Sequence, residues 1–75
     1  MTGSGLRAEL AALRLSQVDF AGLLFVTPRA VHLWLTDERK IPGPVIAWLA
    51  IFKSLSRSAQ LLAVDDMRAA RRKTP

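Results

Sequence analysis

The fold is decided by residues 15–36, which read LSQVDFAGLLFVTPRAVHLWLT and contain two helix starts. At the first start, Ser16 is an N-cap residue, and the carboxylate of Asp19 can reach back to the Ser16 amide in a capping box. At the second start, Thr27 is the N-cap and Pro28 is a residue type favoured at the first helical position. The sequence therefore predicts two separate helices within this short stretch.

Only residues 25–27 remain to connect these two helices. A connection that short makes the helices cross steeply while they stay in contact, which is the geometry of a helix-turn-helix. We therefore expect a helix-turn-helix over residues 16–36, whose second helix runs from Pro28 to Thr36.

Helical spacing of apolar residues continues through the rest of the chain, and the alternation that indicates strands is absent. The remaining helices are expected at about Leu6–Arg14, Pro44–Ser56 and Ser58–Arg72. Residues 1–5 are expected to form a flexible arm, and residues 44–72 to complete the core and provide a dimer interface. The sequence thus predicts an all-α fold, a single compact domain over residues 1–75.

The composition narrows the classes of protein and partner. The 75-residue chain has 11 Lys and Arg against six Asp and Glu, a net charge of +5 and no cysteine. A basic chain favours a polyanionic partner, and the absence of cysteine excludes disulfides and thiolate metal sites and suits a reducing cytoplasm. The longest apolar run, residues 45–52, is far shorter than the roughly 20 residues that span a membrane. We expect a cytoplasmic protein that does not bind a membrane, a metal ion or a cofactor.

The helix-turn-helix residues resemble the lambda-repressor-like, or xenobiotic-response-element (XRE), family of regulators, and the resemblance covers about Leu6 to Leu55. The matching positions are Leu15-Ser16-Gln17, Phe20-Ala21, Leu24, Thr27 to Val31, Trp34-Leu35, Arg39, Ile41, Pro42 and Val45. Two positions depart from the family pattern, because Phe25 and Asp37 stand where the family usually has glycine. The resemblance implies a small phage or mobile-element type of DNA-binding regulator.

The outward face of the second helix is the predicted reading surface for DNA bases. If Val31, Trp34 and Leu35 point inward, the residues that face outward are Arg29, His32, Leu33 and Thr36, with Pro28 at the leading end. Arg29 lies in the first turn, where its guanidinium can donate to O6 and N7 of guanine. His32 can donate to a guanine or a phosphate, and Leu33 suits a thymine methyl group.

Phosphate contacts are expected from groups that flank the reading surface, namely Arg14, Ser16, Gln17, Thr27, Arg39 and Lys40. For Arg39 and Lys40 the alternative is neutralisation of the preceding acids, Asp37 and Glu38. The basic end of the chain, Arg68, Arg71, Arg72 and Lys73, has two open interpretations as well. It either contacts nucleic acid or stabilises its own helix through the helix dipole, with Arg68 paired to Asp65.

The helix predicted at about residues 44–56 is apolar on two faces, which a monomer of this size cannot easily cover. We therefore expect a homodimer whose interface is formed by Ile46, Ile51, Leu61, Leu62 and Val64. The alternative is that the last helix folds back over residues 44–56 within one chain.

These observations predict a sequence-specific transcriptional repressor that is dimeric and autoregulatory. It would bind double-stranded DNA at an inverted repeat whose half-sites lie roughly 34 Å apart. Sequences of this kind occur in phage regulators, antitoxins, restriction controllers and anti-CRISPR-associated repressors. The alternative functions are an antitoxin that also binds a protein and, less favoured, an RNA-binding protein. No enzyme is expected, because a nucleophile with its base, a metal-ligand cluster and a phosphate-binding glycine loop are missing from the sequence. No small-molecule ligand is expected either.

Overall fold

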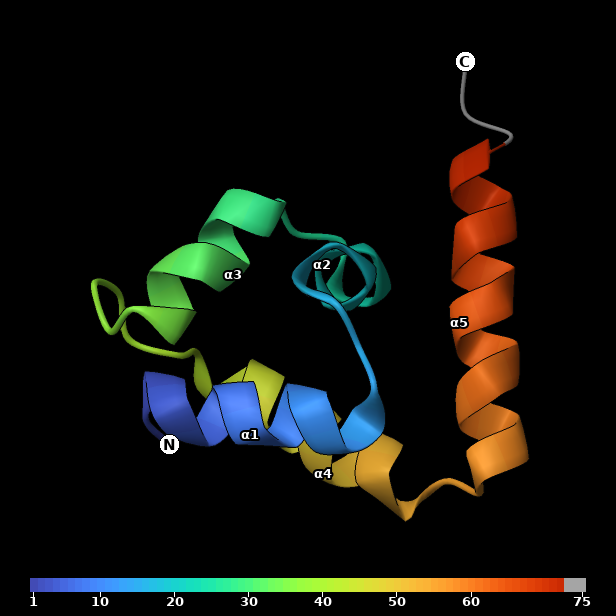
Figure 1. Ribbon diagram of the computed structural model, residues 1–75, viewed down its shortest axis with the longest axis horizontal. Helices are drawn as coiled ribbons and strands as arrows, with labels where there is room; N and C mark the ends of the chain where they lie inside the picture. The colour runs from blue at the N-terminus through green and yellow to red at the C-terminus, as the bar shows by residue number, and fades with distance from the viewer. Residues whose placement is uncertain (73–75) are drawn as a thin grey trace.

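The computed structural model describes residues 1–72, which form five helices (Figure 1). The helices are α1 (Gly3–Leu13), α2 (Gln17–Leu24), α3 (Pro28–Leu35), α4 (Gly43–Ser54) and α5 (Arg57–Arg72). Residues 1–72 include no strand, so the predicted all-α class is confirmed. No single helix in this range is both long and apolar enough to cross a membrane; α2 and α3 reach that length only together, and they are bent by 115°.

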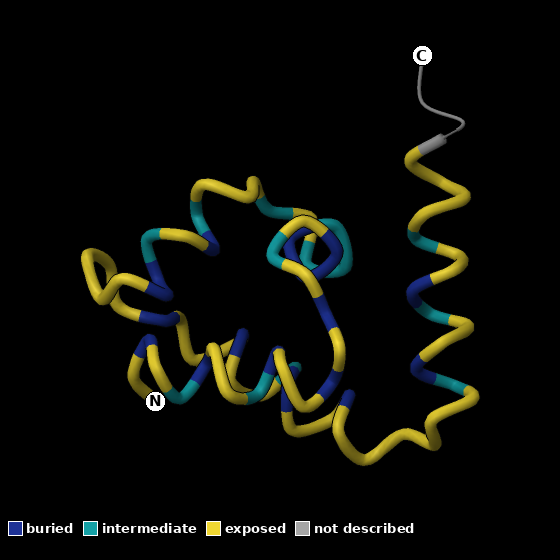
Figure 2. The backbone as a smooth tube through the Cα atoms, viewed as in Figure 1, coloured by how far each residue is buried: buried dark blue, intermediate teal, exposed yellow. Residues whose placement is uncertain are grey.

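The core lies between the first four helices. The largest side chains with under 2% exposure are Phe20, Leu6, Leu49 and Val31, which come from α2, α1, α4 and α3 respectively. Trp48 of α4 extends this cluster. Its ring stacks on that of Phe52 with the ring centroids 4.7 Å apart, and it packs edge-to-face with the ring of Phe20 at a centroid distance of 5.7 Å. Figure 2 shows the buried positions turned toward the centre of the four helices. Each helix therefore contributes one apolar face, as helical spacing requires.

The first helix begins earlier than the predicted start near Leu6. Thr2 caps it, because its Oγ1 accepts from the Gly5 amide at 3.1 Å. A second free amide of this first turn, that of Gly3, donates to Oδ1 of Asp37, a residue distant in the chain, at 2.8 Å. The expectation that residues 1–5 form a flexible arm is therefore wrong for residues 3–5, which are the first turn of α1.

Gly3 is the point where α1 touches the end of α3. A β-carbon placed on Gly3 would lie only 2.2 Å from the carbonyl oxygen of Leu35, which is backbone and cannot move aside. Only glycine fits at this contact, because every other residue carries that atom. A sequence signal for the contact is missing, since the two residues belong to helices that are distant in the chain.

Three residues in the range 1–72 adopt a left-handed backbone without being glycine, and each follows a helix. They are Arg14 (φ 56°), Phe25 (φ 57°) and Asp37 (φ 60°). Phe25 and Asp37 thus take the conformation for which the resembled family uses glycine, and Asp37 gains the Gly3 hydrogen bond in return. Such a backbone is strained by roughly 1 to 2 kcal/mol for a residue with a β-carbon.

The last helix packs against α2, which Figure 1 shows end-on beside the upright α5. Val64 is buried on this side of α5, so its predicted place in a dimer interface is wrong; it completes the core of the single chain instead. Gln60 is also buried, and its Nε2 donates to the carbonyl oxygen of Phe52 at 2.9 Å. This bond anchors the start of α5 to the end of α4.

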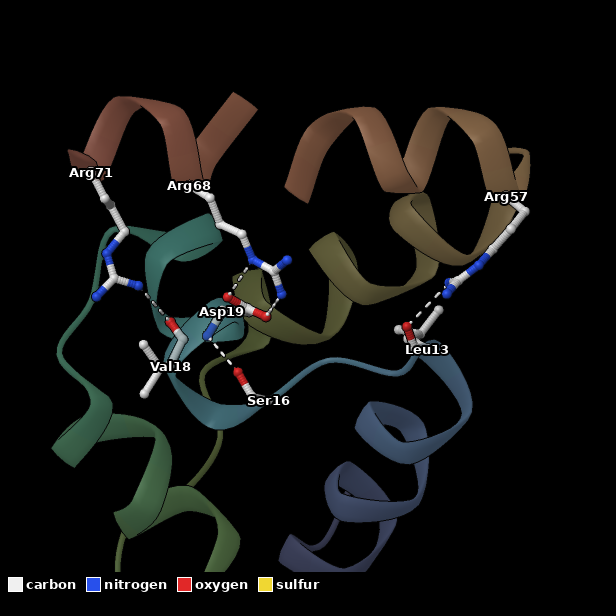
Figure 3. Close-up of polar contacts among 7 residues, drawn as sticks. All are labelled: Leu13, Ser16, Val18, Asp19, Arg57, Arg68 and Arg71. Carbon is white, nitrogen blue, oxygen red and sulfur yellow. Dashed lines mark hydrogen bonds and ion pairs between the residues drawn. The ribbon is translucent and has the colours of Figure 1, made fainter. Parts of the chain in front are cut away.

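An ion pair joins α5 to the start of α2 (Figure 3). Arg68 donates to both carboxylate oxygens of Asp19, from Nη2 at 2.5 Å and from Nε at 3.2 Å. The Asp19 amide donates to Oγ of Ser16 at 3.0 Å, which confirms Ser16 as the N-cap, while the carboxylate faces Arg68. The ion pair of Arg68 is therefore made with Asp19, and the pairing with Asp65 is not formed.

Hydrogen bonding to Arg68 lowers the pKa of the Asp19 carboxyl, and this effect outweighs burial, which raises it. A carboxyl whose pKa is lowered by folding stabilises the fold at every pH above its unfolded pKa, which is about 3.9. The stabilisation is lost as the pH falls below that value and through the folded pKa. Asp19 thus links the packing of α5 to pH in the acid range.

We predict that Gly3→Ala lowers the free energy of unfolding by about 1–3 kcal/mol, because the added methyl group collides with the backbone of Leu35. Urea unfolding followed by circular dichroism measures this change. Gly5→Ala is the matched control, since its β-carbon would meet Oγ1 of Thr2 at an ordinary 3.4 Å. That variant should be as stable as the natural chain or more so. Equal stability of both variants would show that the contact at Gly3 is absent.

We predict that Asp19→Asn lowers the melting temperature at pH 7 and has little effect at pH 3, where the natural carboxyl is losing its charge. Thermal unfolding between pH 2.5 and pH 7 measures the difference between the two chains. Asp66→Asn is the control, because Asp66 is an exposed acid on the same helix as Arg68, whereas Asp65 also attracts Arg68. A difference between Asp19→Asn and the natural chain that stays constant over the whole pH range would contradict the role given to this ion pair.

Candidate nucleic-acid interface

The corner between α2 and α3 is built from three connecting residues. Phe25 ends α2, and the amide of Val26 then donates to the carbonyl oxygen of Ala21 at 3.0 Å. Ala21 is 1% exposed and small enough for the two helices to pack closely. Thr27 caps α3, since its Oγ1 accepts from the Ala30 amide at 3.2 Å. The result is a fixed 115° bend between α2 and α3.

The bend gives α3 one buried face and one exposed face. Val31, Trp34 and Leu35 are buried, as predicted. The exposed positions of α3 and its caps include Thr27, Pro28, Arg29, His32 and Thr36, which lie where the sequence placed them. Leu33 is half-buried, so it presents less apolar surface than expected. The loop after α3 turns back at this point, and the Arg39 amide donates to the Leu33 carbonyl oxygen at 3.1 Å.

The flanking cations are free to meet an anion. Arg14, Arg39 and Lys40 are exposed, and the ion pairs formed within residues 1–72 are Glu9–Lys53 and Asp19–Arg68. The acids beside Arg39 and Lys40 have other partners. Asp37 accepts from the Gly3 amide, and Glu38 accepts from the Thr36 hydroxyl at 2.9 Å. The alternative in which Arg39 and Lys40 only neutralise these acids therefore finds no ion pair among the described residues.

The polar residues predicted to contact phosphate at the starts of α2 and α3 are not equally free to do so. The Thr27 hydroxyl accepts a bond from Ala30, and a hydroxyl also has a hydrogen to donate, for example to a phosphate oxygen. Ser16 is exposed, but its Oγ already accepts from the Asp19 amide at 3.0 Å. Gln17 is half-buried at the start of α2. Thr27 is the cap that adjoins the reading surface.

The basic end of the chain is partly committed to the fold. Arg68 is held by Asp19, and Nη1 of Arg71 donates to the Val18 carbonyl oxygen at 3.4 Å (Figure 3). The side chain of Arg72 and all of Lys73 lie outside the described residues. Arg68 is therefore engaged within the fold, but with Asp19 of α2 and not with Asp65 of its own helix as expected, while Arg71 retains most of its donors.

Sequence reasoning missed a groove beside the corner. An open groove of about 600 Å³ lies between α2, the connection and α5, and its lining includes Phe25 and Pro28 as well as Met67 and Arg71 of α5. Phe25 is 96% exposed. A signal for the groove was not available in the sequence, because it arises only from the packing of α5 against α2. Below we call it the α2–α5 groove.

The exposed residues of α3 supply hydrogen-bonding groups. Arg29 can donate two parallel hydrogen bonds to one planar acceptor pair, and His32 can donate or accept. Within the described residues, three His, Asp or Glu side chains do not come together in a way that could hold a metal ion. The arrangement offers hydrogen-bond donors on the exposed face of α3 and cations in the loop that follows it.

Comparisons of this chain with protein-family models, with curated proteins and with solved structures found no match.

Proposed function

We propose that this protein is a sequence-specific DNA-binding transcriptional repressor that uses α2 and α3 as a helix-turn-helix. The observation that carries the proposal is the two-sided character of α3. Val31, Trp34 and Leu35 hold one face in the core, while Arg29 and His32 project from the other. A helix fixed in this way can enter the major groove without rearrangement, because the groove is about 12 Å wide and a helix with its side chains has a similar diameter.

Base contacts in this proposal come from the first turns of α3. Arg29 lies one residue after Pro28, at the end of the helix that enters the groove first in this mode of binding. Its planar guanidinium matches the O6 and N7 acceptors of guanine, and His32 on the next turn can reach the neighbouring base pair or a phosphate. Thr36 and the exposed part of Leu33 add contacts further along the groove.

Phosphate contacts in this proposal come from both sides of α3. The Thr27 hydroxyl and the amide groups at the start of α3 face one strand, and the exposed cations Arg39 and Lys40 follow the helix. Arg14, Ser16 and Gln17 are the further candidates near α2. These contacts supply affinity and position the protein, and they make binding fall steeply as salt is added.

We further propose that the protein binds as a homodimer to an inverted repeat and represses by occluding the promoter, including its own. The support is a set of large apolar side chains left exposed on α4, α5 and their junction: Ile46, Ile51, Leu55, Leu61 and Leu62. Ile51 is 66% exposed and Leu62 is 62% exposed, which is unusual for residues of this kind in a folded monomer. A second copy of the chain would cover them symmetrically.

The same apolar residues support a second candidate function, that of an antitoxin. In that case they would cover the active surface of a different protein, and α3 would still bind DNA. Purification of the protein together with its neighbouring gene product distinguishes the two possibilities, since a stable complex of two different chains is expected only for the antitoxin.

We predict that Arg29→Ala relaxes the base preference at one position of each half-site and weakens binding by about 1–3 kcal/mol. Selection of bound sequences from random duplex DNA, carried out with both proteins, measures this effect. Arg7→Ala is the matched control, because Arg7 is an exposed arginine of α1 outside the reading surface. Uniform weakening without a change of preference would make Arg29 a phosphate contact. Failure of the natural chain to enrich any duplex, or preference for hairpin RNA, would reject the proposed function.

We predict that the protein sediments as a dimer at high micromolar concentration and that Leu62→Lys converts it to a monomer. The fold should be kept, because Leu62 is exposed and the change removes no core contact. Ala12→Lys is the control, since Ala12 is an exposed residue of α1 and gains the same charge. Sedimentation of the natural chain as a monomer at all concentrations would contradict the dimer.

A further inference from the structure

Phe25 combines two properties that disfavour it in an isolated protein. Its backbone is left-handed, with φ 57° and ψ 38°, and its side chain is 96% exposed. A β-carbon strains this conformation, and an aromatic ring in water contributes nothing to the core. The left-handed backbone is the way in which α2 ends, as α1 does at Arg14, so the exposed ring is the feature that the fold leaves unexplained. Phe25 therefore points to a partner that covers it.

The surroundings of Phe25 indicate where that partner lies. Phe25 lines the α2–α5 groove, whose walls are mainly apolar and include Val18 and Gly22 of α2 and Met67 of α5. Pro28 belongs to the lining of this groove and is also the first residue of the reading surface. The groove thus opens directly beside the end of α3 that is proposed to enter DNA first.

Arg71 supplies the charge that identifies the chemistry of the partner. Its Nη1 makes one long bond, 3.4 Å, to the Val18 carbonyl oxygen, whereas a guanidinium has five N–H donors. Arg68, one turn earlier on α5, is instead paired with Asp19 through both Nη2 and Nε. Asp66 also lines the groove, but it lies more than one helical turn before Arg71. The Asp19 carboxylate attracts Arg71 as well, but its two oxygens are hydrogen-bonded by Arg68, so an anion is favoured at the Arg71 end.

We infer that Phe25 and Arg71 bind one sugar–phosphate strand of the DNA next to the base pairs read by α3. The inference rests on the proposed function. The Phe25 ring packs on a deoxyribose or an unstacked base, and Arg71 donates to the adjacent phosphate. DNA is favoured over a protein segment because the groove shares Pro28 with the reading surface, and because its free donors belong to a cation on a chain with a net charge of +5.

Phe25→Gly separates binding from folding, because the two effects have opposite signs. Glycine adopts the left-handed conformation without strain, so the variant should melt about 4 °C higher than the natural chain. Its affinity for the duplex selected by the natural protein should nevertheless fall about fivefold or more, with the same dependence on salt. Phe25→Ala keeps the strain and should lose the same affinity without the gain in stability.

Arg71→Gln tests the phosphate contact. Its affinity for the same duplex should fall roughly fivefold to tenfold at 0.1 M salt, and the slope of log affinity against log salt should become shallower by about 0.9. Arg7→Gln, which removes an equal charge from α1, should change the slope much less.

The two levels of the proposal fail in different ways. If the natural chain binds duplex DNA and Arg29→Ala changes its preference, but Phe25→Gly and Arg71→Gln bind as the natural chain does, the inference is overturned in favour of a protein occupant of the groove. If the natural chain binds no duplex at all, both the proposed function and this inference are wrong. Reduced affinity of both variants, with the shallower salt slope confined to Arg71→Gln, supports the inference.

Discussion

The structure depends on the corner formed by residues 25–27. Three residues turn the chain by 115° only because Phe25 takes a left-handed backbone and Thr27 begins the next helix at once. The corner sets α3 against the core, where Val31 is fully buried and Arg29 faces outward. The apolar spacing of α3 selects the face that is buried, and the short connection fixes the angle at which the opposite face is presented. The candidate interface is therefore a consequence of how this corner is closed.

Contacts between distant parts of the chain hold the corner in place. At one end of α3, Gly3 lies against the Leu35 backbone and its amide is bound by Asp37. Beside α2, the pair of Asp19 and Arg68 fixes α5. The Asp37 bond satisfies a backbone donor that the first turn of α1 leaves free, and the ion pair joins the first turn of α2 to α5 through side chains. They supply order that a chain of 75 residues cannot obtain from a large core alone.

Local signals in the sequence predicted the fold class, the starts of α2 and α3, and the exposed face of α3, because caps and helical spacing act within a few residues. The contacts of Gly3 with Leu35 and Asp37, the partner of Arg68 and the burial of Val64 were not predictable, since each depends on residues distant in the chain. The Thr2 cap that begins α1 is a local signal that sequence reasoning missed. The α2–α5 groove was not predictable for the same reason as the distant contacts. Its walls come from two helices whose relative position is a tertiary property.

The last helix connects stability with recognition. Val64 and Gln60 bury its first half against the rest of the fold, and this packing offsets the strain that is stored at Phe25. The same packing carries Arg71 to the side of α2, where it lines one groove with Phe25 and Pro28. Because one helix does both, a change that loosens α5 should weaken the fold and remove the groove together. The strained corner and the helix beside it are thus best understood as one unit.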